Sequence, residues 1–456
     1  MKAGNMSDRP AFLIQGERAR LFPVLAENSK EGRTLSILLS CMENVQEFGR
    51  SMLADFGLRI GTRAKIETYT EVVLKNSGSK KFRPDGLIVV RSGSKTWHAL
   101  VEAKVGKNEL SNEQVESYLE IAKMNGVDAV LTISNQFAPL PSHHPLDLSF
   151  QSLRKAQLFH WSWKYVLTIA TLLLKRDEVS DDDQRVILNE MVRFLTHPSA
   201  GVKSFDQMPS QWTAVLESVH AGGEVSPKSS DVQDVIGAWH QEIRDLCLVL
   251  CRQLNENVDI RVPRAHVNDP IARLKSDAEN LAKTHKLYAD FVVPNAVSQV
   301  SVAADFGKKS IYASMRVAAP GDRKSTKARL NWLLRQLKES VPDNIHIKLI
   351  WPGRGQNTLF SLVDLREDPG MAELQGKVAT SFEVIYAKDL AARFGQRKTF
   401  IVELERAVPA FYEQVGQNLR NWQAPAPKIS DDKAEPKSVN TDSLSADAER
   451  FVEEAD

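Results

Sequence analysis

The sequence predicts an α/β protein whose first domain is a mixed β-sheet flanked by helices. In its first third, short apolar runs bounded by turn residues alternate with stretches of helical period. A chain of 456 residues with 42% hydrophobic content is also long enough for more than one core. We expect four parts: the α/β domain (1–175), a helical extension and linker (176–230), an α+β domain (231–423) and a disordered acidic tail (424–456).

The first domain is predicted to open, after a loosely ordered start, with a helix over residues 30–58. Its apolar side chains follow a 3.6-residue period, and Ser29 could cap it. A strand follows at 64–75, and a hairpin loop joins two further strands at 83–90 and 97–104. A helix over 111–125, ending at Gly126, then leads to a strand at 128–134. The remaining expected elements are a short strand at 158–161 and a helix at 163–174.

A helix that connects two strands of one sheet implies that those strands pair in parallel. The helix at 111–125 therefore predicts one parallel pairing in an otherwise antiparallel sheet.

The later part of the chain contains no motif typical of a catalytic or metal-binding site. Residues 222–230 (GGEVSPKSS) suggest a linker, and a helix is expected from 231 to about 255. The acidic, Pro- and Ser-rich composition after 424 favours disorder. The other expected elements are strands at 290–293, 299–305, 310–317, 346–351, 358–363 and 382–386, and helices at 324–340 and 400–422.

Charge and cysteine content narrow the class of protein. The net charge is only +1, but residues 59–107 are locally basic, which suits a polyanion. The three cysteines have no zinc-like spacing. Without a signal peptide or a long apolar run, we expect no membrane association and a soluble, cytoplasmic protein.

Three side chains on the two hairpin strands are expected to form a site. Asp85 begins the first strand, and Glu102 and Lys104 end the second. Neighbouring strands lie about 4.8 Å apart, so both carboxylates could reach one cation. Asp85, Glu102 and the carbonyl of Ala103 would supply part of the oxygen shell that Mg²⁺ prefers. Lys104 would hold a phosphate, or orient or deprotonate a water molecule.

Pro84-Asp85 followed by Glu102-Ala103-Lys104 resembles the motif of the PD-(D/E)xK nuclease superfamily. In the next helix, Gln114 and Tyr118 resemble the QxxxY element of RecB-type members. The resemblance covers residues 30–174. It implies a restriction-endonuclease-like fold, Mg²⁺ dependence with Mn²⁺ as a substitute, and hydrolysis of DNA phosphodiester bonds. It also implies a bacterial endonuclease active in restriction, antiviral defence or repair.

Several alternatives stay open at this stage. Relatives often add a further acid, for which Glu71 is favoured over Glu31. The alternative function is a catalytically silent nuclease fold that binds nucleic acid or serves as a scaffold. An enzyme that uses the same acids for another Mg²⁺-dependent phosphate reaction is a further rival. Residues 231–423 could bind a protein partner or a second copy of the chain, as a homodimer.

Overall fold

The computed structural model describes residues 10–23, 29–58, 60–76, 83–138, 140–146, 148, 153–223, 225–267, 269–340, 343–353, 356–374 and 376–423. The tail predicted to be disordered, at 424–456, lies outside them. Within them the chain forms a mixed α/β structure with two separate sheets.

The first sheet has six strands in the order of the chain. β1 to β4 pair antiparallel, whereas β4, β5 and β6 pair in parallel. The predicted parallel pairing across the 111–125 helix is therefore confirmed, and β6 adds a second one. The strands are β1 (Leu13–Arg18), β2 (Lys65–Leu74), β3 (Gly86–Ser92), β4 (Lys95–Ala103), β5 (Ala129–Ser134) and β6 (Gln157–Ser162).

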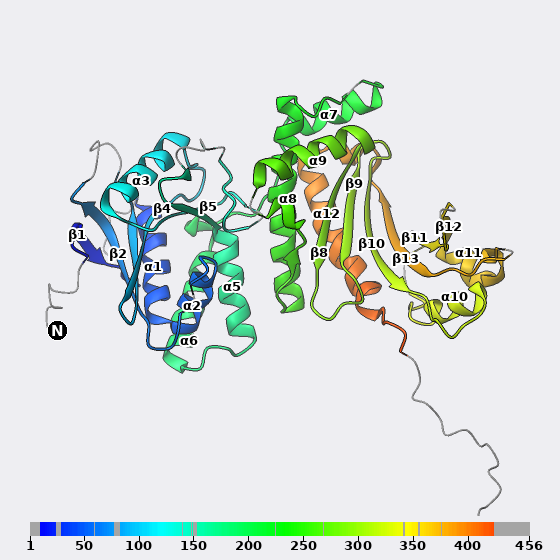
Figure 1. Cartoon of the computed structure of the whole chain (residues 1–456), viewed down its shortest axis with the longest axis horizontal. Coiled ribbons are helices and arrows are strands. Elements are labelled where there is room, and N and C mark those ends of the chain that lie inside the picture. The colour runs from blue at the N-terminus through cyan, green and yellow to red at the C-terminus, as the bar shows by residue number, and fades with distance from the viewer. Residues whose placement is uncertain are drawn as a thin grey trace, which may run out of the picture. The chain divides into compact units, whose positions relative to one another are not determined.

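Helices cover both faces of this sheet (Figure 1). Because side chains alternate along a strand, Ile88 and Val101 face one helical layer while Leu87 and Leu100 face the other. The first layer contains α1 (Lys30–Asn44), α2 (Gln46–Ala54), α5 (Trp163–Lys175) and α6 (Asp182–Thr196). The second layer contains α3 (Asn112–Asn125).

The single helix predicted over 30–58 is wrong, because the chain breaks at Val45. Val45 is extended (φ −110°, ψ 100°), and it separates α1 from α2. A Cβ on Gly49 would lie 2.2 Å from the Met42 carbonyl oxygen, so only glycine lets α2 approach the end of α1 this closely. The prediction also missed β1, an edge strand with two register shifts against β2.

The second sheet has seven antiparallel strands in the order β12-β11-β13-β10-β9-β8-β7. Each of the six predicted strands overlaps an observed one, and the two-residue β7 was not predicted. The strands are β7 (Asp259–Ile260), β8 (Lys286–Val292), β9 (Val300–Asp305), β10 (Ser310–Ala318), β11 (Ile345–Ile350), β12 (Thr358–Ser361) and β13 (Ser381–Asp389).

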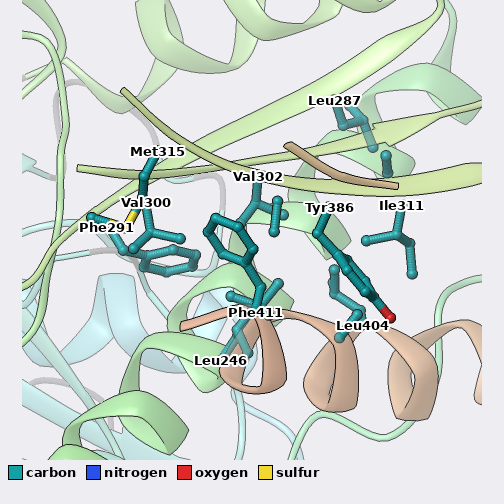
Figure 2. Close-up of a cluster of buried hydrophobic side chains, with 14 of the residues drawn as sticks. Leu246, Leu287, Phe291, Val300, Val302, Ile311, Met315, Tyr386, Leu404 and Phe411 are labelled. Carbon is teal, nitrogen blue, oxygen red and sulfur yellow. The ribbon is translucent and has the colours of Figure 1, made fainter. Parts of the chain in front are cut away.

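Two long helices, α8 (Ser230–Leu254) and α12 (Arg397–Gln414), lie along this sheet (Figure 1). Figure 2 shows Leu246 of α8 and Phe411 of α12 packed with Val302 and Met315 of the sheet. Burial of such side chains supplies much of the stability of this half of the chain. Further helices here are α10 (Thr326–Leu334), inside the predicted 324–340 helix, and α9 (Pro270–Thr284) and α11 (Leu362–Glu367), which were not predicted. The predicted strand 358–363 ends at Ser361, where α11 begins.

The segment predicted as a helical extension, 176–230, divides between the two cores. Leu188 of α6 belongs to the core of the first sheet. Trp212 of α7 (Gln211–His220) is fully buried in the core of the second sheet, where its Nε1 donates to the Phe394 carbonyl oxygen (2.8 Å). Val225, inside the predicted linker, is also buried in that core.

None of the helices in the described part of the chain combines the length and the apolar content that crossing a lipid bilayer requires.

Candidate active site

The pairing of β3 with β4 brings the first two candidate residues together. Gly86 is paired with Val101 in these antiparallel strands. Asp85, which precedes Gly86, therefore lies opposite Glu102, which follows Val101. The backbone N–H of Ala103 donates a hydrogen bond to Asp85 Oδ2 (3.0 Å). This bond fixes the Asp85 carboxylate against the end of β4.

Glu102 is the central residue of the cluster. It is 1% exposed, and Lys104 Nζ lies 2.6 Å from its Oε1. Gln114 Nε2 donates to the same oxygen, also at 2.6 Å. The other carboxylate oxygen, Oε2, is buried and has no hydrogen-bond partner among the described residues. Such a buried acceptor is costly unless a ligand or water satisfies it.

The helix α3 supports the site from the face that Leu100 and Glu102 share. Ser111 caps α3 by accepting from the Gln114 N–H, and Gln114 and Tyr118 follow one turn apart. Gln114 Nε2 donates to Tyr118 Oη (3.1 Å), which donates to the Arg83 carbonyl oxygen (3.0 Å). A chain of hydrogen bonds therefore runs from Glu102 to the segment that precedes Asp85.

The backbone of Lys104 is held on both sides. Its N–H donates to the Ile133 carbonyl oxygen on β5 (2.8 Å), and its own carbonyl accepts from Trp163 Nε1 (2.8 Å). Trp163 is fully buried at the start of α5. Rigid anchoring of this kind keeps a functional side chain within a narrow range of positions.

The two alternatives for a further acid occupy different environments. Glu31, in the first turn of α1, places Oε2 3.7 Å from Lys104 Nζ, and its Oε1 accepts from Asn108 Nδ2 (2.8 Å). Glu71 is exposed on β2, where its backbone is left-handed (φ 54°) and its N–H donates to the Asp85 carbonyl oxygen (3.2 Å). The carboxylate that contacts Lys104 is thus that of Glu31, whereas Glu71 approaches through its backbone.

The electrostatics of the metal-free cluster are unusual. Burial and the neighbouring charge of Glu102 raise the pKa of Asp85 to about 8. Burial alone would lower the pKa of Lys104, but the hydrogen bond and charge of Glu102, with Asp85 and Glu31, outweigh it and raise that pKa. Lys104 is therefore an ammonium ion in this state and not a base. Burial and the nearby carboxylates also raise the pKa of Tyr118, so its phenol stays neutral.

The donor set fits a hard cation such as Mg²⁺. Glu102 Oε2 is a buried oxygen without a partner among the described residues, and Asp85 lies opposite Glu102 on the neighbouring strand. Mg²⁺ commonly uses one or two carboxylates and keeps several water ligands. Within the described residues, no group of three or more His, Cys, Asp and Glu side chains is arranged to hold a metal. A metal here would depend on two carboxylates, the Ala103 carbonyl and ligands from outside the protein.

A cavity of about 410 Å³ lies beside the cluster, lined by Glu31, Lys107, Asn108 and Gly201 among others. Glu31 thus faces both this cavity and Lys104. Sequence reasoning did not single out Asn108 or Trp163, which hold Glu31 and Lys104 in place. The only sequence signal for Asn108 is its position four residues after Lys104.

The sequence matches no protein-family model and, at a significant level, no curated protein.

Proposed function

We propose that the protein is a Mg²⁺-dependent nuclease that hydrolyses phosphodiester bonds of DNA at the Asp85–Glu102–Lys104 cluster. The observation that supports this most directly is the unpartnered Glu102 Oε2 next to Asp85, with an ammonium group 2.6 Å from the other Glu102 oxygen. Carboxylates that could bind a cation and a lysine that could bind a phosphate would then share one small site.

Each residue has a distinct role in this proposal. Asp85, Glu102 and the Ala103 carbonyl hold the metal, which when bound supplies Lewis-acid stabilisation of the phosphate and a lower pKa for water. Lys104 pairs with a phosphate oxygen or orients the attacking water through its positive charge. Gln114 fixes the Glu102 carboxylate, and Tyr118 fixes Gln114. Glu31 keeps Lys104 charged and positioned.

Cleavage assays with matched variants test the proposal. The full chain is incubated with linear duplex DNA, circular duplex DNA, single-stranded DNA and RNA, in Mg²⁺, Mn²⁺ or EDTA. We expect metal-dependent cutting that Asp85→Asn and Lys104→Met each reduce at least 10³-fold. The control is Asp128→Asn, because Asp128 also accepts a backbone N–H bond, from His98 (2.8 Å), but it precedes β5 and lies beside the middle of β4, away from Asp85 and Glu102.

Two results would contradict the proposal. Cutting by Asp85→Asn and Lys104→Met at the wild-type rate would show that the site is assigned wrongly. Binding of nucleic acid without cutting, in every metal, would favour the catalytically silent alternative. A defence, restriction or repair role and a cytoplasmic location remain parts of the proposal that need experiments in cells.

A further inference from the structure

The outer face of the second sheet carries a polar groove that the proposed catalytic site does not include. Its volume is about 570 Å³. The lining residues are Arg261, Ser298, Gln299, Ser301, Ser314, Arg316, Lys348, Ile350, Asn357 and Glu383. Ile350 is the only aliphatic side chain in this set, so the groove differs in kind from the apolar face in Figure 2.

Strand register places the charged side chains in one row. Lys348 on β11 is paired with Glu383 on β13, which is paired with Arg316 on β10. On β10, the alternating residues Met315 and Val317 are buried in the core while Arg316 is exposed. The same alternation that builds the core therefore presents Lys348, Glu383 and Arg316 together on the opposite face.

The groove has more positive than negative charge. Its lining contains three cations and one acid, Glu383. Glu383 already accepts hydrogen bonds from Lys348 Nζ (3.0 Å) and Ser314 Oγ (3.0 Å). Arg316 instead donates to a neutral oxygen, Ser381 Oγ (2.8 Å), and Arg261 donates to the amide oxygen of Gln299. Two guanidinium groups thus lie in the groove bonded to neutral oxygens.

Among the remaining polar side chains, Asn357 adds amide donors to the guanidinium groups. The hydroxyls of Ser298 and Ser301 already donate, to the Gln299 carbonyl oxygen (3.1 Å) and to Asp290 Oδ1 (2.6 Å). From β9 to β11 the groove crosses three strand spacings, or about 14 Å at about 4.8 Å each. A DNA strand carries one phosphate per about 3.4 Å of helix axis, so this length matches about four phosphates.

We propose that this groove binds nucleic acid through its phosphate backbone and holds the substrate outside the cleavage site. The proposal rests on the proposed nuclease function for the identity of the polyanion. An acidic peptide is the alternative occupant of the groove, and the competition experiment below separates it from nucleic acid. Arg261, Arg316 and Lys348 would contact phosphates, so they would add affinity without sequence preference.

Binding measured without metal tests the groove separately from cleavage. Fluorescence anisotropy in EDTA follows labelled duplex and single-stranded DNA over a salt series. The test variant carries Arg261→Gln, Arg316→Gln and Lys348→Gln. The matched control carries three Lys→Gln changes at exposed positions of α9 and α12 that do not line the groove, Lys275, Lys283 and Lys398. Both variants lose the same formal charge.

We expect the slope of log affinity against log salt to fall by about 0.9 for each lost duplex contact, or about 2.7 in the triple variant. If the variant and the wild type bind equally at 1 M salt, a slope change of 0.9 corresponds to an about eightfold loss of DNA affinity per contact at 0.1 M salt. The control variant should bind as the wild type does. Arg316→Lys keeps the positive charge and should retain most of the DNA affinity. Loss of affinity in the Gln variant is then due to the lost charge and not to loss of folding. Bound DNA should also slow the acetylation of Lys348 in the wild-type protein.

Three outcomes would overturn the groove proposal. They are equal loss in the test and control variants, no binding of either DNA by the wild type, and equally effective competition by polyglutamate at matched charge. None of them decides the nuclease proposal, because cleavage is measured separately. Conversely, absence of cutting with groove-dependent binding would leave the groove standing and contradict the nuclease.

Discussion

The raised pKa of Asp85 leads to a prediction about the stability of the metal-free protein. The ordinary value is 3.8 and the folded-state value is about 8, so between these values the folded chain holds a proton that the unfolded chain has lost. Stability must therefore fall as pH rises through this window. Asp85→Asn keeps an oxygen to accept the Ala103 N–H but cannot ionise, so the variant lacks this loss.

The size of the effect follows from the linkage relation. One proton corresponds to about 1.4 kcal/mol per pH unit, so from pH 5 to pH 7 the wild type should lose up to about 3 kcal/mol relative to Asp85→Asn. This is an upper value, because Asp85 is only partly shielded from solvent by its neighbours. Asp128→Asn, which changes an exposed carboxyl group just before β5, should show no comparable trend.

Urea unfolding in EDTA at pH 5, 6 and 7, followed by tryptophan fluorescence, measures these differences. Addition of Mg²⁺ at pH 7 should then stabilise the wild type, by about 2.7 kcal/mol at 100 times the dissociation constant, but not the variant. Wild-type and Asp85→Asn stabilities that run parallel across the three pH values would refute the reasoning about the buried carboxylate pair.

Three further predictions concern particular contacts. Glu31→Gln should slow cleavage at least tenfold while Glu71→Gln leaves it near the wild-type rate, as measured in parallel DNA cutting assays, because of these two glutamates Glu31 is the one whose carboxylate lies near Lys104 Nζ. Gln114→Ala should reduce cutting about 10- to 100-fold at unchanged DNA affinity, since it removes the donor that orients Glu102. Trp212→Ala should lower the free energy of unfolding by about 3–5 kcal/mol in urea titrations, because Trp212 fills the core of the second sheet. Equal rates for the two glutamate variants, full activity of Gln114→Ala, or an unchanged unfolding midpoint for Trp212→Ala would contradict them.

The sequence was most informative where local patterns and tertiary structure agree. The turn between the two apolar runs predicted the β3–β4 hairpin, with Asp85 at the start of one strand and Glu102 at the end of the other. The C-terminal end of α3 at Gly126 is also as predicted, since Gly126 adopts a left-handed conformation (φ 65°). These features depend on neighbouring residues, which a single sequence displays.

Other features depend on contacts between distant segments, and these were not predictable. The apolar period continues through Val45, so periodicity alone could not locate the break between α1 and α2. Glu31 was left as the second choice because its contact with Lys104 spans more than seventy residues and depends on how α1 crosses the end of β4. Trp163 was expected only as the first residue of the 163–174 helix, although its indole N–H also holds the Lys104 carbonyl.

The lengths of the outermost strands bear on how two copies of this chain could associate. The second sheet ends in β12, with four residues, on one side and in β7, with two residues, on the other. β7 covers only Phe291 and Val292 of β8, but the Tyr288 and Asp290 carbonyls further along that strand already accept from Trp239 Nε1 (3.1 Å) and the Arg261 N–H (2.8 Å). An incoming strand therefore finds few backbone groups to pair with, and such edges are a common protection against sheet-to-sheet aggregation. A homodimer of this protein should therefore form through side-chain surfaces, and not by continuation of this sheet from one subunit into the next.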